Sequence, residues 1–268
     1  MVAQPAGTGT NQWNNVPLTA GQYVTYNGSA YVASNLPSAG GSGGGANLSP
    51  SGLNAHVDIF EDFHHNAYGS SMTYGALGLA KTTTGAGAAV SPISGAADAP
   101  GIMQIDAGTT STGSAAVNNY ALSLILTNGP YTNVWRIRIP TLPTGSESFT
   151  AQGGFMDSSS ASVVDGAYWS YNTNDTHFVL RSANNSSRTA ATNTTVVAAN
   201  TWYTLMTVID ATASTATLYV NGGDAVSVSA TMPSARATGV GISITKDQGT
   251  TARTVDVDYV YLGYDVTR

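Results

Sequence analysis

NTWYTLMTVIDATASTATLYVNG, residues 200–222, is the stretch of sequence that decides the fold. Two β-rich runs, 202–210 and 215–220, are joined by a short polar turn, and the second run ends at Asn221-Gly222. Because Asn-Gly favours the tight reversal between antiparallel strands, this stretch predicts an antiparallel meander. The sequence VDVDYVYLGY at 255–264 alternates in hydrophobicity and predicts a further strand near the end of the chain.

The same β pattern continues from residue 57 onward, with turn-forming residues about every 8–12 positions, as in a sandwich or barrel. In 134–139, apolar residues alternate with Arg136 and Arg138, which predicts one buried and one solvent-facing side. Almost nothing indicates helix, and GAGAAVSPISG at 85–95 is interpreted as a loop. Further strands are predicted at 102–105, 120–126, 148–155, 168–171, 177–181 and 240–245.

Strict alternation in the run at 255–264 assigns its side chains to two faces. One face holds Val255, Val257, Tyr259 and Tyr261, and the other holds Asp256, Asp258, Val260 and Leu262.

The N-terminal part has a different composition. Residues 1–36 hold an aromatic group and two β-type runs separated by Asn27-Gly28, which predicts a hairpin with a two-residue loop. PSAGGSGGGA at 37–46 has the composition of a flexible linker. We therefore predict a small β module at 1–36, a Gly/Ser-rich linker at 37–56, and a β-sandwich at 57–268.

Two resemblances sharpen these predictions. The segment TWYTL…TLYVNG, followed by VDVDYVYLG, resembles concanavalin A-like domains of the LamG/laminarinase type, which implies an all-β, antiparallel jelly-roll sandwich. The segment YVTYNG…YVA, at 23–33, resembles the small chitin-binding modules of carbohydrate-binding families five and twelve. That second resemblance implies glycan contacts for Trp13, Tyr26 and Tyr31.

Composition excludes several classes of function. Only 9% of residues are charged, and the net charge is −6 with a pI near 4.9, which disfavours a nucleic-acid partner. Cysteine is absent, so disulfides and zinc-thiolate sites are excluded. No apolar run reaches the about 20 residues of a membrane helix, and the N-terminus lacks the features of a secretory signal. A polar, exterior-type chain without an export signal predicts a virion protein released by lysis.

Glycan-cutting chemistry requires two carboxylates flanking the scissile bond. The chain has two glutamates, Glu61 and Glu147, and lacks the E-x-D-x-E arrangement of the resembled enzymes. Asp256 and Asp258 are spaced about 7 Å apart along a strand, but they alternate with Val and Tyr and are interpreted as structural. The sequence therefore predicts a protein that is not an enzyme.

Asp58 and Asp62 belong to the densest acidic cluster, VDIFEDFHH. Together with Asp256 and Asp258 they are candidates for a structural Ca²⁺ site, because first and last strands of such sandwiches are often neighbours and Ca²⁺ needs several oxygen ligands. No other cofactor is predicted.

The run YWSYNTND, at 168–175, offers aromatic and polar groups of the kind that bind sugars. One interpretation is that Trp169 and Tyr171 form a platform for a glycan, and the other is a buried Trp followed by an Asn-rich turn. Trp135 and Trp202 are interpreted as core residues. The polar candidates of the platform hypothesis are Asn172, Asn174 and Asp175.

The main hypothesis is a non-enzymatic surface protein of a tailed-phage virion, as a capsid decoration, head fibre or tail-associated adhesin. It would display a lectin-like sandwich to host surface polysaccharide, contact other virion proteins, and form a homo-oligomer, with a trimer expected. A free lectin or adhesin and a laminarinase-type hydrolase are the alternatives. Neither nucleic-acid binding nor membrane insertion is expected.

Overall fold

The computed structural model describes residues 22–26, 31–35, 55–63, 74–119, 124–127, 129–159, 162–233 and 236–266. The chain forms two compact units, Met1–Gly52 and Leu53–Arg268. The secondary structure of the described ranges consists of β-strands and turns. Within those ranges, no helix has the length and apolar character that would cross a membrane.

The first unit contains an antiparallel hairpin of β1 (Gln22–Tyr26) and β2 (Tyr31–Asn35). Because Tyr26 pairs with Tyr31, four positions separate the strands, so the hairpin is confirmed but its predicted two-residue loop is wrong. The glycan contacts predicted for this unit concern side chains outside the described part of the chain, namely those of Trp13, Tyr26 and Tyr31.

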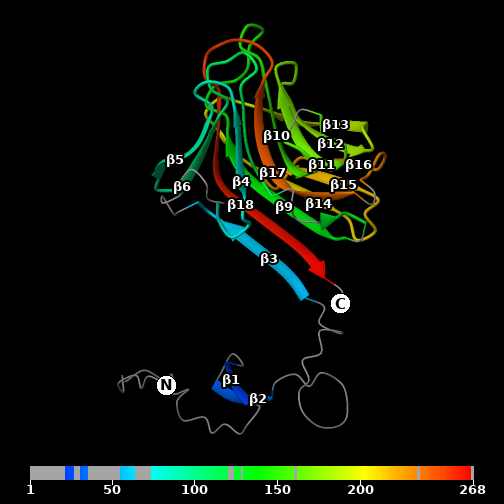
Figure 1. Cartoon of the computed structure of the whole chain (residues 1–268). Helices are drawn as coiled ribbons and strands as arrows, with labels where there is room; N and C mark the ends of the chain where they lie inside the picture. The colour runs from blue at the N-terminus through cyan, green and yellow to red at the C-terminus, as the bar shows by residue number, and fades with distance from the viewer. Residues whose placement is uncertain are drawn as a thin grey trace. The chain divides into compact units, whose positions relative to one another are not determined.

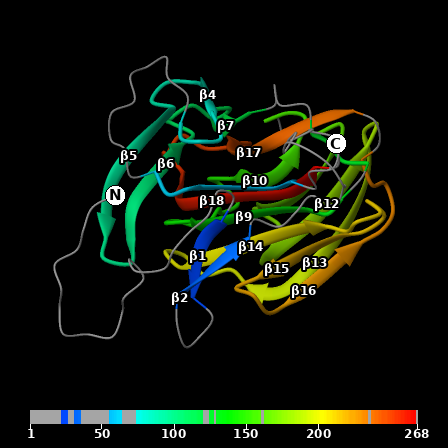
Figure 2. The same ribbon diagram turned by 90° about the horizontal axis from the view of Figure 1, so that it is seen from below.

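The second unit is a sandwich of two antiparallel sheets, which confirms the predicted jelly-roll architecture (Figure 1). Figure 2 shows the two layers from below. We call them the front and back sheets. In order of pairing, the front sheet consists of β13 (Ser187–Val196), β12 (His177–Asn184), β11 (Gly166–Asn172), β10 (Phe149–Met156), β17 (Ala237–Lys246), β7 (Ser114–Asn118) and β4 (Ala80–Thr84), with β8 (Leu124–Ile125) paired to β17. The back sheet consists of β16 (Ala225–Val228), β15 (Ala216–Val220), β14 (Trp202–Ile209), β9 (Tyr131–Arg138), β18 (Thr254–Val266), β6 (Ala99–Asp106) and β5 (Ala89–Ala96), with β3 (Ala55–Glu61) paired to β18.

The predicted meander forms one edge of the back sheet. β14 pairs with β15, and β15 pairs with β16 across the Asn221-Gly222 reversal. Asn221 and Gly222 both have positive φ, of 52° and 72°, which is the backbone conformation that a type I′ turn requires at its two central residues. The local turn chemistry therefore selects this reversal as predicted.

The side-chain faces of β18 differ from the predicted ones. A β-bulge between Val257 and Tyr259 adds one residue to the strand, and the alternation changes phase there. As a result Val260 and Leu262 lie in the core with Val255, whereas Tyr259 and Tyr261 lie outside it. β3 lies beside β18, so the first strand of the sandwich is a neighbour of the last (Figure 1).

The segment predicted as a loop at 85–95 contributes most of β5, so that interpretation is wrong for residues 89–95. Pro92 lies within the strand, where its lack of an N–H would break a ladder hydrogen bond in a central position. Among the described strands, β5 is the edge strand of the back sheet and pairs only with β6, so this proline is tolerated.

The core between the sheets is rich in large aromatic side chains. Trp135 is fully buried as predicted, whereas Trp202 is half-buried on the outer face of the back sheet. There the guanidinium groups of Arg136 and Arg138 lie 5.2 and 4.8 Å from the Trp202 ring centre, within the range of cation–π attraction. The prediction that Trp202 is a core residue is therefore wrong.

A polar groove on the front sheet as candidate ligand site

A shallow polar groove of about 140 Å³ lies on the outer face of the front sheet, over β10 to β13. The lining residues of β10 and β11 occupy alternate positions, so they share the face opposite to core residues such as Trp169. The groove is lined by Thr150, Gln152, Tyr168, Ser170, Asn172, Arg181 and Arg188.

Cross-strand pairing arranges these side chains in rows. Gln152 lies opposite Ser170, and Tyr168 lies opposite Arg181. Gln152, Ser170 and Tyr168 are each no more than 3% exposed, so they form the floor. Ser243 lies opposite Gln152 on β17, and its buried hydroxyl has no hydrogen-bond partner among the described residues. The floor thus presents hydroxyl and amide groups to a ligand.

Two arginines supply the charge of the groove. Arg181 Nε donates a hydrogen bond to Ser170 Oγ at 2.7 Å. Arg188 donates from Nε and Nη2 to the Val163 carbonyl at 3.2 and 2.8 Å. Burial raises the pKa of Tyr168, and the charges of both arginines lower it by less, so the phenol stays neutral at neutral pH. The lining therefore combines neutral polar groups with two positive charges.

The structure divides the residues predicted at 169–175. Trp169 and Tyr171 are 0% and 3% exposed and lie in the core, so neither can present a ring face to a sugar. Asn172 lies in the groove, and its side-chain oxygen accepts a hydrogen bond from the Asn174 backbone at 2.8 Å. Asp175 is half-buried, and burial raises its pKa against the opposing charge of Arg181.

The sequence alone does not single out most residues of the groove. The missed residues lie on strands whose polar positions alternate with core residues, as in Thr150-x-Gln152 and Tyr168-x-Ser170. This alternation is visible in the sequence, but it marks any solvent-facing side of a sheet. The register of the consecutive strand pairs β10 to β13 is what brings the lining together.

The aspartates considered for calcium occupy separate environments. Asp256 accepts hydrogen bonds from Arg138, and Asp258 accepts one from Arg136, so each carboxylate has a cationic partner. Asp58 accepts from His56 Nε2 at 3.1 Å and from the Tyr261 hydroxyl. The described residues contain no group of three or more His, Asp or Glu side chains that could hold a metal ion.

Asp62 and Asp258 are close enough to interact electrostatically, and the Asp62 charge contributes to the raised pKa of Asp258, of which burial is the largest cause. Asp58 lies further along the ladder, opposite Gly263. The four predicted ligands therefore do not converge on one point.

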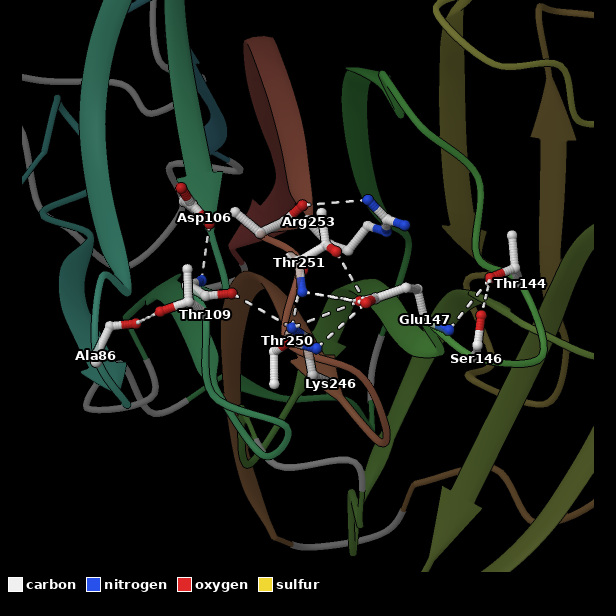
Figure 3. Close-up of polar contacts among 12 residues, drawn as sticks. Ala86, Asp106, Thr109, Thr144, Ser146, Glu147, Lys246, Thr250, Thr251 and Arg253 are labelled. Carbon is white, nitrogen blue, oxygen red and sulfur yellow. Dashed lines mark hydrogen bonds and ion pairs between the residues drawn. The ribbon is translucent and has the colours of Figure 1, made fainter.

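Both glutamates bind backbone amides. Glu61 accepts hydrogen bonds from the N–H groups of Phe63 and Ala76, at 2.9 and 2.8 Å. Glu147 accepts from the backbone N–H groups of Thr250 and Thr251, between β17 and β18, and from the Thr251 hydroxyl (Figure 3). These contacts hold connecting segments of the sandwich in place.

Lys246 is a buried cation beside Glu147. Its Nζ is fully buried, donates to the Thr251 carbonyl at 2.8 Å, and lies 3.9 Å from the Glu147 carboxylate (Figure 3). Desolvation acts to raise the pKa of Glu147, but the hydrogen bonds from Thr251 and Thr250 and the Lys246 charge outweigh it and lower the pKa. Glu147 is thus an ionised structural group.

Comparisons with known proteins agree with this fold. The family model described as SO2946-like, C-terminal domain, matches residues 98–258. The SO2946 protein of Shewanella oneidensis MR-1, of unknown function, is 14% identical over 80% of this chain and 88% of that chain, with a TM-score of 0.58. Peanut lectin is 11% identical over 80% of this chain and 100% of that chain, with a TM-score of 0.52.

A β-glucanase from Bacillus licheniformis is 12% identical over 76% of this chain and 97% of that chain, with a TM-score of 0.49. No curated protein matches the chain in sequence. At such low identities, the two matches with TM-scores of 0.58 and 0.52 show a shared β-sandwich fold alone, and function has to be argued from the site.

Proposed function

The chain belongs to the family of SO2946-like C-terminal domains, and we propose that in this chain the domain binds a glycan in the groove of the front sheet without cutting it. The observation that carries this proposal is the convergence of hydroxyl, amide and guanidinium groups in a single groove of about 140 Å³. Such groups match the dense hydroxyls of a sugar, because each can donate or accept a directed hydrogen bond.

Several contacts support binding without hydrolysis. Paired-carboxylate hydrolysis needs two acidic groups about 5–9.5 Å apart across the scissile bond. Among the described residues, no carboxylate lines the groove. Glu61 and Glu147 are hydrogen-bonded to backbone amides, and both would have to leave those contacts to act on a substrate.

Replacement of Gln152 with alanine tests the groove. Gln152 belongs to the floor of the groove, opposite Ser170 on β11 and Ser243 on β17, and its amide can hydrogen-bond a sugar hydroxyl. Loss of one neutral hydrogen bond costs about 1 kcal/mol, so we expect about fivefold weaker binding of a glycan selected from a bacterial polysaccharide panel. Titration calorimetry on the full chain measures the affinity, and reducing-end release in the same samples should stay at background.

Thr82→Ala is the matched control, because Thr82 is exposed on β4 at the far edge of the same sheet. The control should bind as the parent chain does. Equal binding by Gln152→Ala and the parent would reject the groove as the glycan-binding site. Failure of every glycan in the panel to bind would reject the proposed function. Release of reducing ends would reject binding without cutting.

We also propose a setting for this activity, the surface of a tailed-phage virion as a capsid decoration, head fibre or tail-associated adhesin. The supporting features are a weakly charged, Ser/Thr/Asn-rich chain and a separate N-terminal unit that could attach to another virion protein. Display of several copies, for which we propose a trimer, would raise the avidity of weak glycan sites. Stoichiometric recovery of the chain in purified particles is the expected result, and recovery only as free protein would contradict it.

A further inference from the structure

We propose that the sugar held in the groove is acidic and that Arg181, supported by Arg188, binds its carboxylate. This inference rests on the proposed function and adds the chemical class of the ligand. It is carried by two arginines that line the same groove and have no carboxylate partner among the described residues.

The two guanidinium groups stand on neighbouring strands. Arg181 lies opposite Ala190 on β13, and Arg188 lies two residues away along that strand, so the two are diagonal neighbours. Side chains in this relation have Cβ atoms about 7–8 Å apart, within reach of long side chains. One bound anionic group can therefore be approached by both arginines.

The hydrogen bonds of Arg181 leave its outer edge open. Its Nε is held by Ser170, which orients the guanidinium plane, while its two Nη atoms have no acceptor among the described residues. A guanidinium presents such paired N–H groups in the geometry that a carboxylate accepts with both oxygens. Arg181 is thus preorganised for a carboxylate by the floor of the groove.

Three of the other described arginines provide a contrast. Arg136 and Arg138 are paired with Asp258 and Asp256, and Arg236 lies 3.2 Å from Asp165. Neither Arg181 nor Arg188 lies within salt-bridge distance of a carboxylate in the described part of the chain. Asp175 interacts with Arg181 only at longer range. In a protein of net charge −6, two unpaired arginines in one groove mark a local site for an anion.

The dimensions of the groove favour a single unit of an extended chain. Its volume of about 140 Å³ is below the roughly 300–1,000 Å³ of pockets that enclose a drug-sized ligand. One sugar ring can therefore enter the groove, and the adjoining units of a polymer would lie along the polar face of the sheet.

The test compares acidic oligosaccharides with their own neutral esters. Oligomers of galacturonate and of mannuronate are titrated into the full chain by calorimetry, each beside its methyl-esterified form. We expect the acid form to bind at least about tenfold more tightly, because a charge-assisted pair is worth about 1.5–3 kcal/mol. Arg181→Gln should weaken acid binding about tenfold to hundredfold and leave ester binding nearly unchanged.

Lys81→Gln is the matched control, since it removes one positive charge from exposed β4 at the opposite edge of the same sheet. It should change acid binding less than twofold. Equal affinity for acid and ester would overturn the inference and leave glycan binding intact. If only neutral glycans of the wider panel bind, the inference of an acidic sugar is likewise overturned and glycan binding stands. If no glycan binds, both proposals are rejected.

Discussion

Replacement of Arg138 with methionine should lower the free energy of unfolding by about 3–5 kcal/mol. Asp256 is only 1% exposed, and its carboxylate accepts hydrogen bonds from Arg138 Nε and Nη2 at 3.0 and 2.6 Å. Gln104 donates the remaining contact at 2.9 Å. Without the guanidinium, a buried negative charge would keep one neutral partner, and its lost hydration would no longer be compensated.

Urea unfolding of the full chain, followed by far-ultraviolet circular dichroism, measures this loss. The double variant Arg138→Met/Asp256→Leu should recover most of the stability, because buried ion pairs can often be replaced by apolar groups at little cost. If single and double variants are equally unstable, the loss comes from packing of Arg138 on Trp202, and the charge argument fails. Arg253→Met is the control, because Arg253 has no carboxylate partner in the described part of the chain.

The pairing of Asp256 and Asp258 with arginines also bears on function. Two aspartates spaced two residues apart on one strand suggested either a metal site or a carboxylate pair. Each is instead neutralised by an arginine from β9: Asp256 by Arg138 directly across the ladder, and Asp258, in the bulge, by Arg136. The alternating Trp135-Arg136-Ile137-Arg138 pattern of β9 and the acidic positions of β18 are thus two halves of one structural feature.

The sequence predicts the architecture where the controlling interactions are local. Asn221-Gly222 adopts the positive φ values that its residue types favour, and alternation in β9 identifies the core position of Trp135. The predictions fail where a long-range interaction decides. The bulge after Val257 exists only through pairing with β9, and Pro92 is tolerated only because β5 is an edge strand.

Of the residues that line the candidate groove, the sequence predicts one, Asn172, as part of a sugar site. The other lining residues are ordinary alternating polar positions whose meaning depends on which strands pair. Arg181 and Arg188 are separated by a hairpin that brings them to the same face, and the sequence pattern alone does not align them. For Trp169 and Tyr171 the sequence allows both a sugar platform and a core position, because an aromatic run suits either. The structure places both side chains in the core.

Replacement of Trp169 with alanine should lower the free energy of unfolding by about 3–5 kcal/mol, because it removes a large, fully buried ring. The Trp169 ring meets that of Phe178 edge-on, with centres 6.0 Å apart. It also covers Gly153 on β10, where a Cβ would lie 2.7 Å from the indole. A glycine directly opposite the tryptophan thus provides the space that the indole fills, and alanine would leave that space empty.

Urea unfolding measures the stability, and glycan titration on the folded fraction of the same sample measures binding. Trp169→Phe should cost less, because most of the ring volume remains and the indole N–H has no hydrogen-bond partner among the described residues to lose. Both variants should bind glycan with unchanged affinity per folded molecule, since the groove lies on the other face of β11. Retained stability together with lost binding in Trp169→Ala would reverse this assignment, because only a ring that contacts the sugar could produce that combination.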